Sequence, residues 1–247
     1  MWTYPRVLAH RGGGVSAPEN TMAALRMGCS MGFRGVEFDV MATRDDGLIL
    51  MHDDVLGRTI AGKGSIGDLS VADLLAMDAG AWFSADYQGE PVPLFTDAAE
   101  YCINSGLQMN VEIKPVPGQE LRTAELVAQC CAELPPSSVL LSSFSLEALR
   151  VAKRLAPDVP RAWLVESVPR HWQQSLADSD TTRLHVQASR INHSTISELK
   201  AQGIQLLCYT VNDPLQAIAL FDMGVDAICT DRLDLIGPDF FDKRGND

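Results

Sequence analysis

The chain has 247 residues, 46% hydrophobic and 21% charged, which excludes a disordered, collagen-like or low-complexity protein. Its 20 Lys and Arg against 32 Asp and Glu give a net charge of −12. This charge repels nucleic acid and anionic lipid, so we expect neither nucleic-acid binding nor stable membrane association. The six cysteines form no C-x-x-C pair, and the first residues lack the basic and apolar parts of a signal peptide. We therefore expect a cytoplasmic protein with reduced thiols, and the sequence leaves open whether it forms a homo-oligomer.

Short apolar runs alternate with longer stretches of helical spacing along the chain. Candidate strands lie at residues 6–10, 35–40, 108–114, 139–144, 161–165, 183–188, 205–211 and 226–231. Candidate helices between them lie at residues 21–31, 120–133, 146–155, 194–202 and 214–223. Eight βα units in about 250 residues predict an α/β fold, a closed (β/α)8 TIM barrel forming one catalytic domain over residues 1–247. An open doubly wound sheet is the alternative.

The segment after the second strand departs from this repeat. The turn-rich residues 43–47 are too few for a parallel crossover, so the apolar run at 48–52 should pair antiparallel with that strand. Residues 53–93 follow as a small insertion with a short helix expected at 71–77, capped by Ser70 and Asp73. The insertion also carries the aromatic residues Trp82, Phe83 and Tyr87. Because these would otherwise lie in water, we expect it to pack over the C-terminal end of the barrel.

Polar residues end several of the predicted strands, and active sites of such barrels lie at the C-terminal strand ends. His10 and Arg11 end the first strand and precede three glycines at 12–14. Arg offers a planar, permanently charged fork, and glycines let the backbone approach a ligand closely. The motif therefore suits binding and protonation of a phosphate. A solvated His–Arg pair before a flexible turn is the alternative.

Two carboxylates lie two residues apart in the second strand. Glu37 and Asp39 project from one face, and their apolar neighbours from the other, so the carboxylates should point into the barrel. Oxygen ligands suit the hard ions Ca²⁺ and Mg²⁺. We therefore expect a site for one divalent metal ion, against the alternative of carboxylates with a purely structural role.

The same spacing places Asn110, Glu112 and Lys114 on one face of the third strand. Glu112 can complete a three-carboxylate metal site, while Lys114, nearer the strand end, can meet an anionic oxygen. A structural ion pair between these two residues is the alternative.

A second histidine, His52, follows the hairpin run and precedes two aspartates that could fix its tautomer. Together with His10 it would supply the acid and the base that displacement at phosphorus needs. We expect the other histidines to be surface or core residues. Ser143 ends a strand but lies in no G-x-S-x-G motif, which argues against serine hydrolysis.

An ordered set of short motifs resembles one known family. They are His10-Arg11-Gly12, Pro18-Glu19-Asn20-Thr21, Glu37-Phe38-Asp39, His52-Asp53, Glu112-Ile113-Lys114, Ser143-Phe144, Tyr209-Thr210-Val211-Asn212 and Thr230-Asp231. The chain looks like a glycerophosphodiester phosphodiesterase, most similar to the bacterial cytosolic branch. One departure is Tyr209, where many members carry Trp, which bears on the shape of the alcohol or glycerol pocket.

The resemblance implies hydrolysis of a glycerophosphodiester, such as glycerophosphocholine or glycerophosphoethanolamine, to sn-glycerol 3-phosphate and an alcohol. It also implies seven site residues: metal ligands Glu37, Asp39 and Glu112, catalytic histidines His10 and His52, and phosphate-binding Arg11 and Lys114. Which histidine is the acid, which ion works, and whether water or the glycerol 2-hydroxyl attacks stay open. The alternatives are a related barrel phosphodiesterase acting on lysophospholipids or inositol phospholipids, and a non-catalytic glycerophosphodiester-binding protein.

Overall fold

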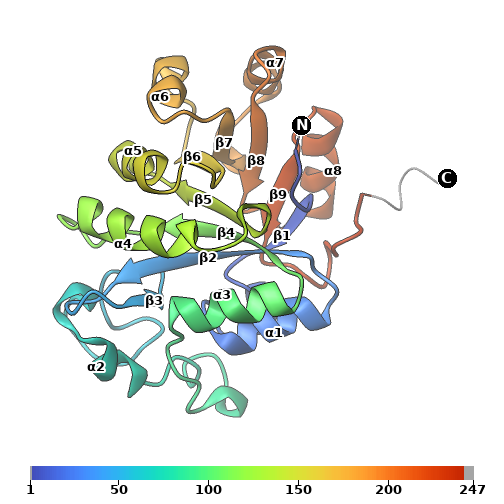
Figure 1. Cartoon of the computed structure of the whole chain (residues 1–247). Coiled ribbons are helices and arrows are strands. Elements are labelled where there is room, and N and C mark those ends of the chain that lie inside the picture. Colours follow the sequence, from blue (N-terminus) through green and yellow to red (C-terminus); the bar gives the residue numbers. More distant parts are fainter. Residues whose placement is uncertain (1, 242–247) are drawn as a thin grey trace.

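A closed barrel of parallel strands, with helices around it, forms the body of the molecule in the computed structural model, which describes residues 2–241 (Figure 1). β1 pairs in parallel with both β2 and β9, which closes the ring and excludes the open sheet. The barrel strands are β1 (Val7–Ala9), β2 (Gly35–Ala42), β4 (Gln108–Ile113), β5 (Val139–Ser143), β6 (Arg161–Val165), β7 (Arg183–Gln187), β8 (Gln205–Tyr209) and β9 (Ala227–Thr230). The predicted TIM barrel is confirmed, with strand boundaries within two residues of those expected.

Helices connect the strands around the barrel. Within residues 2–241 they are α1 (Met22–Ser30), α2 (Val71–Leu75), α3 (Phe95–Asn104), α4 (Glu120–Ala132), α5 (Leu146–Leu155), α6 (Trp172–Asp178), α7 (His193–Ala201) and α8 (Pro214–Asp222). Hydroxyl oxygens of Thr21 and Ser145 accept hydrogen bonds from first-turn amides of α1 and α5, which explains where these helices begin. The helices expected between strands are confirmed, while α3 and α6 lie in gaps for which no particular helix was predicted.

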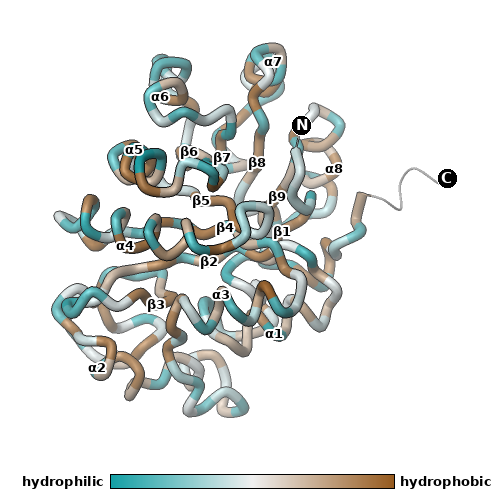
Figure 2. The backbone as a smooth tube through the Cα atoms, viewed as in Figure 1, coloured by the Kyte–Doolittle hydropathy of each residue, from teal (hydrophilic) through white to brown (hydrophobic). Residues whose placement is uncertain are grey.

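The main hydrophobic core lies between the outside of the barrel and the helices. Phe38 and Val40 of β2 point into this core, where the ring centroid of Phe38 lies 6.2 Å from that of Phe95 on α3. Figure 2 shows hydrophobic strands inside and more hydrophilic outer faces on several helices. Because side chains alternate along a strand, Glu37 and Asp39 point to the inside of the barrel, as predicted.

β3 (Leu48–Leu50) pairs antiparallel with the end of β2, which confirms the predicted hairpin. The insertion that follows contains α2 and lies beside β3 (Figure 1). Its Ile66 and Leu74 share a second apolar cluster with Met41 and Ile49, which belong to β2 and β3. The predicted Ser–Asp capping box is present, but α2 ends two residues before the expected boundary.

Two predictions about domain organisation are not decided by these contacts. That residues 53–93 as a whole cover the C-terminal end of the barrel stays a prediction. That one domain spans residues 1–247 also stays a prediction, since residues 1 and 242–247 lie outside the described part.

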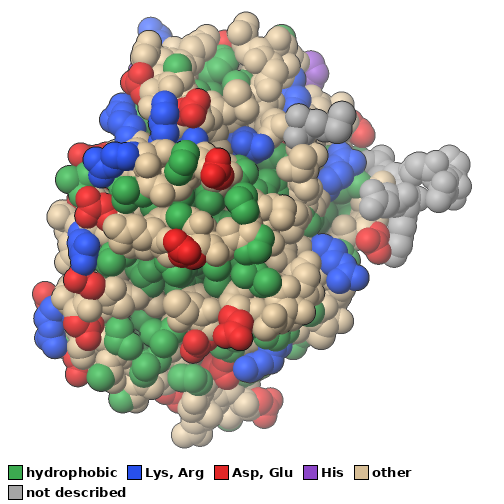
Figure 3. All heavy atoms as spheres, in the orientation of Figure 1, with side chains coloured by type: hydrophobic (Ala, Val, Ile, Leu, Met, Phe, Trp, Pro, Cys, Tyr) green, Lys and Arg blue, Asp and Glu red, His purple; other side chains and the backbone are tan. Residues whose placement is uncertain are grey.

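Charged side chains of both signs are interspersed with hydrophobic ones on the face drawn in Figure 3. Among residues 2–241, none of the helices combines the length and the apolar character needed to cross a bilayer.

Candidate active site

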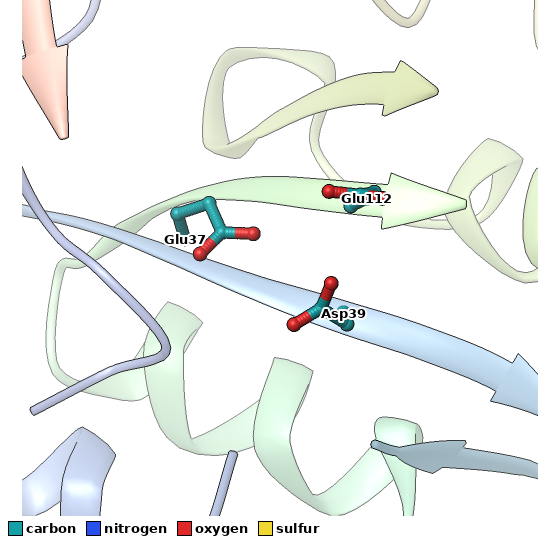
Figure 4. Close-up of side chains that lie close together, drawn as sticks. All are labelled: Glu37, Asp39 and Glu112. Carbon is teal, nitrogen blue, oxygen red and sulfur yellow. The ribbon is translucent and has the colours of Figure 1, made fainter. Parts of the chain in front are cut away.

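Three carboxylates lie together inside the barrel. Strand register places Asp39 of β2 beside Glu112 of β4. Glu37 lies beside Asn110, two residues earlier on both strands. One oxygen from each of Glu37, Asp39 and Glu112 lies within 4.8 Å of the others. Figure 4 shows that the three side chains come from these two neighbouring strands. The two-residue spacing read in the sequence thus produces a buried acidic triad.

The electrostatics of this triad show whether it can hold a cation. Burial, followed by the charge of Asp39, raises the pKa of Glu37 to about 7 and that of Glu112 to about 8. Burial also disfavours the Asp39 carboxylate, but Lys114 and Arg11 outweigh it and lower the pKa of Asp39. The Oε1 atom of Glu112 accepts no hydrogen bond. Since buried carboxylates need a cation, this oxygen donor set fits a metal ion.

Two basic side chains flank the triad. Lys114 Nζ lies 3.2 Å from Asp39 Oδ1 and 3.3 Å from Glu112 Oε1, the second contact being an ion pair without hydrogen-bond geometry. Arg11 Nε lies 3.8 Å from Asp39 Oδ2, and its Nη1 donates to Glu19 at 2.6 Å. The Glu112–Lys114 ion pair is therefore present. One ammonium group shared between two carboxylates, however, leaves part of the negative charge uncompensated.

The backbone of Arg11 also takes part in the site. Arg11 has φ 51°, in the left-handed region that a non-glycine residue enters at a cost of about 1–2 kcal/mol. In this conformation its amide donates to Glu37 Oε2 at 3.1 Å while its side chain reaches Asp39. Such strain is found where the surrounding structure holds a functional group in place.

His10 is oriented by a carboxylate from the last strand. Its Nδ1 lies 2.6 Å from Asp231 Oδ1, and its Nε2 lies 3.8 Å from Glu37 Oε2. Because an ionised carboxylate only accepts, Nδ1 carries the proton and Nε2 is available for chemistry. Burial disfavours the charged ring, but the Asp231 hydrogen bond and the Glu37 charge outweigh it and raise the pKa of His10.

His52 has a matching arrangement. Its Nδ1 lies 2.7 Å from Asp53 Oδ1, and Arg58 donates to both oxygens of Asp53. The Arg58 hydrogen bond is the main reason that the pKa of Asp53 falls to about 2. Burial lowers the pKa of His52 in spite of the nearby Asp39 charge. The His52 ring is therefore held by Asp53 through Nδ1, which leaves Nε2 available for proton transfer.

One cavity of about 220 Å³ gathers these groups. All seven site residues predicted from the sequence line it, together with Asn110, Phe144 and Tyr209. The arrangement offers two oriented imidazoles, two cationic side chains and a carboxylate triad to one ligand. It suits binding an anionic ester and moving protons on either side of it.

Several supporting residues were not among the predicted site residues. Asp231 orients His10, Asn20 donates to Asp39 Oδ2 at 2.9 Å, and Glu19 joins Arg11 to Arg58. Asp231 ends a strand, and Glu19 and Asn20 lie in a motif noted for its resemblance, so the sequence carried a signal for these three. Arg58 carried none, because it lies in a turn of the insertion.

The comparison with known proteins now decides the family. A sequence model of the glycerophosphoryl diester phosphodiesterase family matches residues 10–235. The chain belongs to this family. The predicted family, the TIM-barrel fold and the enzyme class, glycerophosphodiester phosphodiesterase, are therefore confirmed.

Individual family members align over nearly the whole chain. The glycerophosphodiester phosphodiesterase of Caldanaerobacter subterraneus is 30% identical over 230 residues, covering 91% of this chain and 93% of its own. That of Bacillus subtilis is 28% identical over 251 residues, covering 92% and 84%. Among solved structures, an Oleispira antarctica phosphodiesterase in complex with the product sn-glycerol 3-phosphate is 36% identical, with a TM-score of 0.87 over 92% of this chain and 93% of that one.

Proposed function

We propose that the chain hydrolyses glycerophosphodiesters, such as glycerophosphocholine and glycerophosphoethanolamine, to sn-glycerol 3-phosphate and an alcohol. The observation that carries this proposal is the convergence of two carboxylate-oriented histidines on a carboxylate triad flanked by Arg11 and Lys114. Hydrolysis of a phosphodiester needs charge neutralisation and two proton transfers, which these groups supply. The product bound in the Oleispira antarctica relative supports the choice of sn-glycerol 3-phosphate.

Glu37, Asp39 and Glu112 would hold one divalent ion, Ca²⁺ or Mg²⁺, which when bound neutralises developing charge on a phosphate oxygen. Arg11 and Lys114 bind the remaining phosphate oxygens, Arg11 as a planar fork and Lys114 as a point charge.

The two histidines move the protons. Nε2 of one takes the proton of the nucleophile, and Nε2 of the other gives a proton to the departing alkoxide. Asp231 and Asp53 hold the two rings in the tautomer that leaves each Nε2 toward the reaction. The nucleophile is water, or the glycerol 2-hydroxyl by way of a cyclic phosphate. The predicted cytoplasmic location and the exclusion of nucleic-acid and membrane partners stay predictions from composition.

The test is release of sn-glycerol 3-phosphate from glycerophosphocholine, read with a coupled glycerol-3-phosphate dehydrogenase assay. We expect activity that disappears with EDTA and returns with Ca²⁺ or Mg²⁺. A His10→Asn, His52→Gln double variant is the control for contaminating enzyme. No release from folded protein under any metal condition, across several alcohol groups, would overturn the proposal.

A further inference from the structure

A second hollow, of about 360 Å³, opens beside the central cavity, and we call it the Trp82 hollow. It shares His10 and Arg11 with the central cavity, and its apolar lining includes Val15, Trp82 and Phe83. Because Arg11 lines both spaces, a group attached to a phosphate that Arg11 holds would lie next to this hollow.

Several contacts hold the aromatic lining of the hollow in place. The indole N–H of Trp82 donates to the Ala79 carbonyl at 2.9 Å, and the Trp82 and Phe83 rings meet edge to face with centroids 5.7 Å apart. Glu90 ties the same loop to α1 by accepting from the Ala23 amide at 2.8 Å. Trp82 is nevertheless 42% exposed. The hollow that His10 lines thus has a large, partly exposed aromatic surface, on which a ligand could pack.

The polar groups of the hollow are already engaged. Glu19 accepts from both Arg11 and Arg58, and Asp231 is bound by His10 and by Asn212. Two arginines offset the charge of Glu19, and both oxygens of Asp231 already have a hydrogen-bond partner, so neither carboxylate is left without a partner for a cationic ligand. What the hollow adds to binding is apolar contact with Val15, Trp82 and Phe83.

The central cavity has the opposite character. Asn110 lines it, and its Oδ1 is buried and accepts no hydrogen bond. The glycerol arm of a diester carries two free hydroxyl groups, which need such partners when they leave water. The glycerol arm therefore suits the central cavity, and the other arm is left for the hollow.

We propose that the Trp82 hollow is the binding site of the leaving alcohol, and that it selects alcohols by apolar contact rather than by charge. This inference rests on the proposed function. It assigns the preferred substrates as glycerophosphodiesters whose alcohol presents a bulky apolar surface, such as the trimethylammonium group of choline.

The experiment compares three esters of sn-glycerol 3-phosphate: choline, its neutral isostere 3,3-dimethylbutanol, and ethanolamine. In the wild-type protein we expect kcat/KM for the first two to agree within about threefold and to exceed that for ethanolamine. Trp82→Ala should lower kcat/KM about tenfold for both bulky esters and threefold or less for ethanolamine. The Ki of sn-glycerol 3-phosphate should not change, since the product has no alcohol arm.

Two matched variants guard against a merely structural effect. Leu75→Ala removes an exposed side chain from the same insertion, away from the hollow, and should change none of these constants. Trp82→Phe keeps an aromatic surface and should retain most of the preference for the bulky esters.

The inference is wrong if Trp82→Ala leaves the ratio of choline to ethanolamine unchanged, or if it raises the Ki of sn-glycerol 3-phosphate. It is also wrong if the wild-type protein prefers choline over its neutral isostere by tenfold or more, because charge would then decide. If no ester were hydrolysed, the proposed function would fail. The binding constants of the same three esters, measured by calorimetry in wild type and Trp82→Ala, would then test the inference separately.

Discussion

At the scale of single residues, the site depends on partners that restrain otherwise ordinary groups. His10 and His52 each have an aspartate on Nδ1, but one aspartate is the next residue and the other is 221 positions away. Glu37 and Glu112 have raised pKa values because burial and a neighbouring carboxylate disfavour their charge. The roles of histidines and carboxylates can therefore be separated by substitution.

Substitutions at His52 and Glu37 should affect different constants. His52→Gln should lower kcat by about 10² to 10⁴-fold with metal affinity intact, because it removes a proton-transfer group. Glu37→Gln should weaken metal binding and recover part of its rate in excess metal, because it removes a ligand charge. Rates measured across metal concentration separate the two effects. Equal metal affinity in both variants would contradict the assignment.

His185 of β7 should make stability depend on pH. It is fully buried and neither ring nitrogen has a hydrogen-bond partner, so burial, with a smaller effect of Arg183, lowers its pKa to about 3. Below pH 6.5 His185 is protonated in the unfolded chain but stays neutral in the folded chain. The free energy of unfolding therefore falls as the pH falls from 6.5 toward 3.

The measurement is urea unfolding of His185→Phe and wild-type protein at several pH values. Relative to pH 7, the variant should gain about 2 kcal/mol over the wild type at pH 5. His193→Gln, which changes an exposed histidine, should follow the wild type. A difference between His185→Phe and wild type that is constant with pH would show that His185 protonates equally in both states.

At the scale of elements, the loop after β1 packs against the end of β9, where the first and last strands of the barrel meet. The loop after β1 lies so close to the end of β9 that Val15 N donates to the Asp231 carbonyl at 2.9 Å. Gly14, at φ 55°, makes this approach feasible, because a Cβ there would lie 2.1 Å from the Asp231 carbonyl oxygen. The position of Asp231 against His10 thus depends on a glycine in another element.

Gly14→Ala should accordingly damage catalysis. We expect kcat to fall about 100-fold, because Asp231 must move away from His10, and the free energy of unfolding to fall by about 1–2 kcal/mol. Steady-state kinetics and urea unfolding measure the two effects. Gly237→Ala is the control, since a Cβ there meets no atom within 4 Å. A fully active Gly14→Ala protein would show that the β1 loop does not position Asp231.

At the scale of the whole molecule, one metal ion would link two barrel strands. A ligand that binds only the folded state at 100 times its Kd stabilises it by about 2.7 kcal/mol. The triad exists only when β2 and β4 are paired, so an ion bound there stabilises the whole fold.

Addition of Ca²⁺ or Mg²⁺ at that concentration should raise the Tm by about 5–10 °C, and EDTA should reverse the rise. Because the chain carries a net charge of −12, NaCl at equal ionic strength controls for screening. A Glu37→Gln, Glu112→Gln double variant should show only the effect of salt. An equal rise in wild type and double variant would remove the triad as the metal site.

The sequence by itself determined the barrel and the composition of its site. Alternation of strands and helices predicts a parallel sheet, and the period of two along a strand predicts that Glu37, Asp39 and Glu112 share the interior. The His52–Asp53 pair was readable because its members are neighbours. Only the tertiary structure decided that Asp231 orients His10, that Glu19 joins Arg11 to Arg58, and that Trp82 lies beside the reacting groups. Local patterns encode strands and their faces, whereas these contacts arise from barrel closure and loop packing, which bring together residues far apart in the chain.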